Sequence, residues 1–214
     1  ILADREGLVV TETQQGGNDS ATPRALIPPH LVINDVLDKD VAAGLLAYAL
    51  AREAAFHPTT TGGAAGQRTN PHMRTSVALR DLGPFRAVVT EKMLEHMPEL
   101  AARLGVAAVN GARFELELVA HNEGAFYKRH IDTQTASDRD TIRVLSGVYY
   151  FHAEPKGFTG GALRLYAIGD PSHRTFLDVE PRNNSLLVFP AWAPHEVMPV
   201  GCPSQRFASS RFAV

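Results

Sequence analysis

The sequence predicts an α+β protein in which helices pack against the outside of a double-sheet β-barrel. Three observations predict this class. Helical spacing of apolar residues is confined to the first half of the chain. The second half holds short alternating or β-branched segments separated by Gly and Pro turns, and no internal repeat is present. The length of 214 residues suits one domain with an N-terminal extension and is enough to bury a sizeable core.

The composition limits the classes of function. Hydrophobic residues make up 44% and charged residues 21%, as in an ordinary soluble globular protein. The single cysteine, Cys202, excludes a disulfide framework and any Cys-based metal site built from this chain alone, and it favours a reducing, cytoplasmic location. Nine histidines make imidazole and carboxylate the favoured metal ligands. A net charge of −2 and the lack of an apolar run of about 20 residues predict neither a nucleic-acid partner nor a membrane span.

The first half is expected to carry the helices. We expect an arm over residues 1–28, with a short strand at Leu8-Val9-Val10, and one domain over 29–214. Within that domain, 29–110 is predicted to be helical support and 111–214 the β core. The expected elements of the support are a strand at Leu31–Ile33, a helix from Asp38 to Glu53, a loop from His57 to Asn70, and a second helix that opens at Gly83-Pro84, is interrupted at Pro98 and ends at Leu104-Gly105.

The second half is expected to be all β. Its expected strands lie at 114–118, 143–151, 162–166, 175–179, 185–189 and 196–200, with a last one between 205 and 214.

His130 and Asp132 are the first candidates for chemistry. Residues two apart on a strand point to the same side, so the two side chains share a face and Ile131 turns away. One imidazole and one carboxylate form most of a divalent-metal site, and a second histidine would complete a 2-His-1-carboxylate triad with open positions. The tripeptide alone is common by chance, and an exposed His and Asp at a strand end is the alternative.

His195 is the natural third ligand. It follows an apolar strand and a Pro-bounded turn in Phe189-Pro190-Ala191-Trp192-Ala193-Pro194. A histidine that caps this turn is the alternative. The rivals His121, His152 and His173 lack a comparable context.

Two arginines near the C-terminus are candidates for an anion site. An iron(II) site that activates oxygen needs electrons, which a 2-oxoacid supplies by decarboxylation. The far carboxylate of such a co-substrate is best held by a bidentate arginine. Arg206 and Arg211 are an odd number of residues apart, so on one regular strand only one of them faces inward.

Taken in order, these segments resemble the iron(II)/2-oxoglutarate-dependent dioxygenases, in the prolyl-4-hydroxylase-like branch. The resemblance covers about residues 114–214, and more loosely residues 28–104. The segments that carry it are Gly124 and Tyr127 before His130-Ile131-Asp132, Val148–Phe151, Gly160–Leu163, Pro181–Phe189, His195-Glu196-Val197, Pro199-Val200 and Arg206-Phe207-Ala208, with Arg74-Thr75-Ser76 in the first half.

The resemblance implies a double-stranded β-helix, or jelly roll, backed by helices. It implies that His130, Asp132 and His195 bind Fe(II) and act as the catalytic centre. Arg206 is preferred over Arg211 for the C5 carboxylate of 2-oxoglutarate, because the family's basic residue follows shortly after the second histidine. The resemblance also places Tyr150 at that carboxylate and Leu163 in the pocket wall. His121 stands where the family usually has a tyrosine, and it is a candidate to take over that contact.

The function that the resemblance implies is hydroxylation of an unactivated C–H bond with Fe(II), 2-oxoglutarate and O2, with ascorbate as a candidate supporting reductant. The implied substrate is a prolyl residue in a peptide or protein. The alternatives are a hydroxylase of a free amino acid or natural product, a non-catalytic metal-binding jelly roll, and, more weakly, a nucleic-acid demethylase on the same fold.

Overall fold

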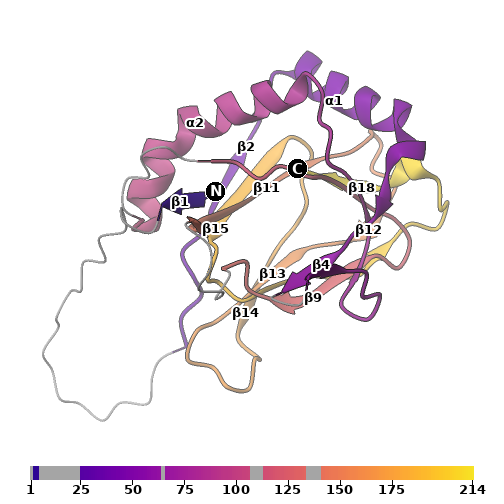
Figure 1. Ribbon diagram of the computed structural model, residues 1–214. Helices are drawn as coiled ribbons and strands as arrows, with labels where there is room; N and C mark the ends of the chain where they lie inside the picture. The colour runs from indigo at the N-terminus through magenta and orange to yellow at the C-terminus, as the bar shows by residue number, and fades with distance from the viewer. Residues whose placement is uncertain (1, 5–24, 64–65, 107–112, 134–140) are drawn as a thin grey trace, which may run out of the picture.

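Two antiparallel sheets lie face to face, and both helices cover the outer face of the larger one (Figure 1). The computed structural model describes residues 2–4, 25–63, 66–106, 113–133 and 141–214. The expected strand at Leu8-Val9-Val10 lies outside these residues. In the described part of the chain, neither helix is long and apolar enough to cross a membrane.

The larger sheet has seven strands. In spatial order they are β2 (Leu31–Asn34), β15 (Ser185–Pro190), β11 (Leu145–Phe151), β18 (Arg211–Ala213), β8 (Leu118–His121), β7 (Val77–Leu79) and β3 (His57–Pro58). Strands from both halves of the chain thus pair in one sheet. The segment expected to be helical support also supplies β2, β3 and β7.

The smaller sheet has five strands. Their spatial order is β14 (Phe176–Val179), β13 (Leu163–Tyr166), β16 (His195–Val197), β9 (Phe126–His130) and β6 (Arg74–Thr75). Three further pairs complete the described strands: β1 (Leu2–Asp4) with β10 (Thr141–Arg143), β12 (Thr159–Gly160) with β17 (Val200–Gly201), and β4 (Thr61–Gly63) with β5 (Gly66–Arg68).

Helices α1 (Lys39–Ala51) and α2 (Phe85–Leu104) close the main core against the larger sheet. The expected interruption at Pro98 is wrong, because α2 runs through it. Met93 and Met97 before the proline and Leu100 after it are all buried, so continuous apolar burial offsets the backbone hydrogen bond that Pro98 removes. Gly105 ends the helix in the left-handed conformation, as expected.

The two faces of the larger sheet have different partners. Tyr149 belongs to the cluster beneath the helices, whereas Tyr150 belongs to a smaller cluster between the sheets. This inner cluster comprises Tyr150, Leu163, Leu165, Leu187, Phe189, Ala193 and Ala213. Strand alternation at residues 149 and 150 therefore sends one tyrosine to the core and the other to the space between the sheets.

The jelly-roll prediction is confirmed by this antiparallel double-sheet architecture and by the structural relatives given below. Some boundaries differ. The strand expected at 114–118 begins only at Leu118, and the expected loop after His57 contributes β3, β4 and β5. The last strand occupies Arg211–Ala213, after a 3-10 turn at Phe207–Ser209.

Candidate metal and co-substrate site

His130, Asp132 and His195 converge at one end of the smaller sheet. His130 ends β9 and faces His195 at the start of β16. One ligand atom from each of the three residues lies within 4.8 Å of the others. His130 Nε2 is 3.5 Å from Asp132 Oδ1, and His195 Nε2 is 3.7 Å from Asp132 Oδ2. The structure thus brings together the three residues that the sequence singled out.

Backbone carbonyls orient both imidazoles. His130 Nδ1 lies 2.7 Å from the Lys128 carbonyl, and His195 Nδ1 lies 2.9 Å from the Ala193 carbonyl. A carbonyl oxygen only accepts, so each Nδ1 carries a hydrogen, and in the neutral imidazole the lone pair is then on Nε2. The Ser146 hydroxyl donates to Asp132 Oδ2. Two Nε2 atoms and one carboxylate, on side chains that are each oriented by a further hydrogen bond, suit a divalent transition metal.

The electrostatics of the cluster favour the protonation states that metal ligands need. Burial alone would raise the pKa of Asp132, but the contact with His130 and the charges of both histidines outweigh it and hold that pKa well below its usual range. Burial, together with the charge that His130 can carry, lowers the pKa of His195 to about 4. At neutral pH the carboxylate is therefore charged and the His195 imidazole neutral.

An irregularity in β9 builds the wall beside His130. His195 and Val197 are two residues apart on β16, yet they face His130 and Tyr127, which are three apart on β9. The extra residue is a β-bulge, and it turns Tyr127 to the same side as His130. Their rings stack with centroids 3.6 Å apart, and the Arg74 guanidinium lies 4.9 Å from the Tyr127 centroid.

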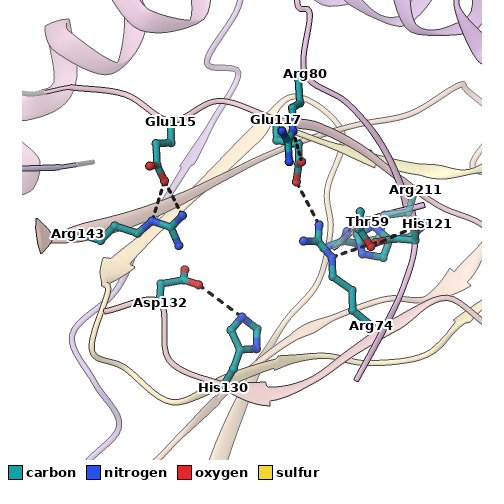
Figure 2. A network of polar contacts seen from close by, with 11 residues as sticks. Thr59, Arg74, Arg80, Glu115, Glu117, His121, His130, Asp132, Arg143 and Arg211 are labelled. Carbon is teal, nitrogen blue, oxygen red and sulfur yellow. Dashed lines mark hydrogen bonds and ion pairs between the residues drawn. The ribbon is translucent and has the colours of Figure 1, made fainter. Parts of the chain in front are cut away.

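Two glutamates hold arginines around the metal cluster, as Figure 2 shows. Glu117 pairs with Arg74 at 3.5 Å and with Arg80 at 3.8 Å. Glu115 pairs with Arg143 at 2.5 Å, and Arg143 lies above Asp132 in this view. Sequence reasoning assigned no role to Arg74 or Arg143, because their proximity depends on pairings between strands that are distant in the sequence.

A second polar cluster lies on the larger sheet, around Arg211. Arg211 on β18 is directly opposite His121 on β8, and only 1% of it is exposed. Its Nη1 donates to His121 Nδ1 at 3.1 Å, and its guanidinium lies 4.7 Å from the centroid of the Tyr150 ring. Arg211 Nε, His121 Nε2 and Tyr150 Oη are buried and have no hydrogen-bond partner among the described residues.

This cluster suits a carboxylate. Since an arginine only donates, His121 Nδ1 accepts and the hydrogen of the neutral imidazole sits on Nε2. Burial, followed by the charge of Arg211, lowers the pKa of His121 well below its ordinary value, so the ring stays neutral. Arg211 Nε–H, His121 Nε2–H and the Tyr150 hydroxyl are therefore three buried donors. The Arg211 guanidinium forms no ion pair within the described residues. An anion would satisfy both the charge and the donors.

Gly161 permits this arrangement. A Cβ atom at this position would lie 2.7 Å from Arg211 Cδ and 2.9 Å from Val200 Cγ2, and its φ of +72° disfavours any other residue. The close approach of the Gly160-Gly161 turn thus packs the stem of Arg211 in place.

The preference for Arg206 over Arg211 is not supported by the structure. The Arg206 side chain is exposed and precedes the 3-10 turn at Phe207–Ser209, outside any strand. That turn breaks the regular alternation that the sequence argument assumed, and Arg211 is the arginine that is buried. Tyr150 and Leu163 lie in the inner cluster, and His121 contacts Arg211. Neither rival histidine, His152 or His173, belongs to the metal cluster found among the described residues.

An antiparallel double-sheet fold with two histidines and a carboxylate at one end is typical of the jelly-roll oxygenases that use non-haem iron. The sequence model of the 2OG-Fe(II) oxygenase superfamily matches residues 116–214, the part of the chain that holds His130, Asp132 and His195.

The chain is also similar to three known proteins. The chain is 41% identical over 133 residues to an uncharacterized PKHD-type hydroxylase of Synechocystis sp., a match that covers 60% of this chain and 43% of that protein. The chain thus spans less than half the length of this relative. A prolyl-4-hydroxylase from Pseudomonas putida is 24% identical with a TM-score of 0.59, over 87% of this chain and 89% of that one. A prolyl hydroxylase from Trichoplax adhaerens is 21% identical with a TM-score of 0.62, over 86% and 80%. At these identities the two structures show a shared fold.

The buried neutral His121 predicts a specific dependence of stability on pH. The pKa of His121 is lowered in the folded state, so below about pH 6.5 the unfolded chain binds a proton that the folded protein does not. The free energy of unfolding should fall with decreasing pH, and His121 should contribute up to about 1.4 kcal/mol per pH unit.

Urea denaturation between pH 7 and pH 5 measures this dependence. The slope of the free energy of unfolding against pH should be shallower for His121→Gln than for the parent. The exposed His57 offers a matched control, since His57→Gln should keep the parent slope. Equal slopes for the parent and His121→Gln would contradict a neutral, buried His121.

Proposed function

We propose that the protein is an Fe(II)- and 2-oxoglutarate-dependent dioxygenase that hydroxylates a prolyl residue in a peptide or protein. The observation that carries this proposal is the pairing of a metal-ligand cluster on one sheet with a buried, uncompensated guanidinium on the other. The resemblance of the sequence to the iron(II)/2-oxoglutarate-dependent dioxygenases implies both features, one for iron and one for the co-substrate.

His130, Asp132 and His195 are the residues that would hold the iron. Their two Nε2 atoms and the carboxylate would supply three ligands and would leave room at the metal for further ligands. The bound ion would bring 2-oxoglutarate and O2 together and couple decarboxylation of the oxoacid to oxidation of a C–H bond. The chain keeps the ligands in their binding state through the Lys128 and Ala193 carbonyls.

Arg211, His121 and Tyr150 are the residues that would hold the far carboxylate of 2-oxoglutarate. Arg211 offers charge and a free Nε–H, while His121 Nε2–H and the Tyr150 hydroxyl add two donors. These charge-assisted hydrogen bonds form in a buried site, where they are strongest. Leu163 packs beside Tyr150 and provides an apolar wall for the methylene groups of the co-substrate.

The side chains around the metal cluster would contact the substrate. Tyr127 offers an aromatic face beside His130, and Arg143 and Arg74 stand at either side with their paired glutamates. An aromatic wall with donors and acceptors suits a peptide, whose backbone has both. One structural relative was determined with a peptide fragment of the hypoxia inducible factor, and two of the relatives are prolyl hydroxylases. These relatives favour a prolyl residue as the target.

An anaerobic titration tests the metal and co-substrate part of the proposal. Fe(II) and then 2-oxoglutarate are added to the metal-free protein, and the visible spectrum is recorded. We expect a charge-transfer band for the parent and none for His130→Ala, because chelation of the oxoacid requires an iron held by all three ligands. The band should persist in His57→Ala, which removes an exposed histidine on β3. A folded, iron-bound parent without a band would favour the non-catalytic metal-binding barrel.

The same band distinguishes the two arginines. Arg211→Ala should raise the Kd of 2-oxoglutarate by about 100-fold or more, because removing one partner of a buried charge pair costs about 3–5 kcal/mol. Arg206→Ala should change the Kd by less than about twofold, since the side chain is exposed and lies outside the cluster. The reverse order would restore the assignment of the carboxylate to Arg206.

Prolyl specificity is tested by measuring whether succinate formation is coupled to oxidation of a peptide. Peptides that differ only by proline or alanine at one position are incubated with protein, Fe(II), 2-oxoglutarate and O2, and succinate and peptide mass are measured. The proline peptide should stimulate succinate formation and gain one oxygen atom, whereas the alanine peptide should leave only slow uncoupled turnover. Equal stimulation by both peptides would exclude prolyl hydroxylation, and stimulation by a free amino acid alone would favour the small-molecule alternative.

A further inference from the structure

A groove of about 660 Å³ lies on the side of β9 that faces away from the metal cluster. Its walls include Arg129, Ile131, Tyr166, Ile168, His173 and Pro194. The volume is within the range of sites that take a ligand the size of a few amino-acid residues. No part of the proposed metal or co-substrate chemistry uses these walls.

The groove and the metal cluster share one residue, at the end of β9. His130 lines it as well as contributing to the cluster, and Ile131 lies between the two ligands His130 and Asp132. Ile131 follows directly after β9 and lines the groove. The end of β9 is therefore the point at which the groove lies nearest to the proposed ligands.

The walls combine apolar surface with one available cation. Ile131 and Ile168 are each 45% exposed, which is unusual for two large apolar side chains that line one groove. The Arg129 guanidinium lies 5.3 Å from the centroid of the Tyr166 ring and forms no ion pair with any described residue.

The nearby carboxylate does not compensate Arg129. Asp170 also lines the groove, but both of its oxygens accept hydrogen bonds from its own loop: Oδ1 from the backbone N–H and hydroxyl of Ser172, and Oδ2 from the N–H groups of Arg174 and Thr175. His173, at the same rim, packs edge-on against Tyr166 with centroids 6.4 Å apart. The groove thus has a free positive group, two aromatic rings and an aliphatic floor.

We propose that this groove binds a segment of the substrate protein that flanks the hydroxylated residue, in which an apolar side chain is followed or preceded by an acidic one. The apolar side chain packs between Ile131 and Ile168, and the carboxylate binds Arg129. This inference rests on the proposed function, because it takes the occupant to be the polypeptide that enters the metal cluster. Because His130 both lines the groove and belongs to the metal cluster, a segment next to the hydroxylated residue is favoured over an unrelated ligand, and Arg129, which forms no ion pair with a described residue, favours an acidic side chain.

Binding of defined peptides tests the groove without any turnover. Fluorescein-labelled peptides of alternating leucine and aspartate, leucine and lysine, or serine and aspartate are titrated with the full chain, and fluorescence anisotropy is recorded. We expect the leucine–aspartate peptide to bind more tightly than either of the others by about tenfold or more. Arg129→Glu should weaken its binding by at least about tenfold, and Ile168→Ser should weaken it too.

Matched variants control for unspecific effects. Arg182→Glu reverses an exposed charge outside the groove, and Leu94→Ser removes an apolar side chain on α2 that is 48% exposed. Neither should change the affinity by more than about twofold. Equal binding of the leucine–aspartate and leucine–lysine peptides, unchanged binding by Arg129→Glu, or equal loss in Arg182→Glu would each overturn the proposal. So would sedimentation that shows a dimer broken by Ile168→Ser, because the groove would then be an interface between two copies.

The failure of this inference can be told from the failure of the proposed function. Asp132→Ala removes a proposed metal ligand but should bind the leucine–aspartate peptide as the parent does. Binding without hydroxylation of any peptide would support the groove and contradict the proposed function. Hydroxylation of a proline peptide with leucine–aspartate flanks, with a KM that Arg129→Glu leaves unchanged, would contradict the groove and support the function. If the groove binds the flanking segment and the protein is a prolyl hydroxylase, Arg129→Glu should raise the KM of that peptide. The kcat, and the uncoupled turnover without peptide, should stay near their parent values.

Discussion

The pairing of β9 with β16 is the constraint on which the site depends. This pairing sets His130 opposite His195, so that two residues 65 positions apart present their imidazoles to one point. The bulge in the same pair turns Tyr127 onto the His130 ring. A shift of one residue in this register would reverse the face of each side chain and remove one histidine from the cluster. The backbone hydrogen bonds of two short strands therefore decide whether a metal site exists.

The metal-ligand cluster and the polar cluster around Arg211 lie on different sheets. His130 and His195 belong to the smaller sheet, while Arg211, His121 and Tyr150 belong to the larger one. The inner cluster between the sheets joins them: Tyr150 packs with Leu163 and Leu165, and the Phe189 ring meets the His195 ring with centroids 4.7 Å apart. The span between the two sites is therefore set by a small apolar core, and a change of volume there would alter it as well as the stability.

The sequence was most informative where one local rule decides the outcome. His130 and Asp132 lie together as predicted, although β9 ends at His130 and Asp132 follows the strand, and Gly105 correctly marked the end of α2. The sequence was least informative where the local conformation depends on contacts with residues that are distant along the chain. The bulge that turns Tyr127 inward depends on β16, and Pro98 stays helical because the sheet beneath α2 buries residues on both sides of it. Arg206 was preferred by its distance from His195, but the turn at Phe207–Ser209 displaces it and leaves Arg211 on the strand.

Burying Arg211 has an energetic consequence for the whole fold. A guanidinium that loses its water without gaining a carboxylate destabilises the folded state, and here its described contacts are one imidazole nitrogen and an aromatic face. His121 adds to this cost, because it must stay neutral to accept from Arg211. An anion bound beside Arg211 would replace the lost interaction with water. By binding only the folded state, it would also stabilise that state. Arg206, exposed and solvated, carries no such cost, and this asymmetry is the physical ground on which the two arginines are assigned different roles.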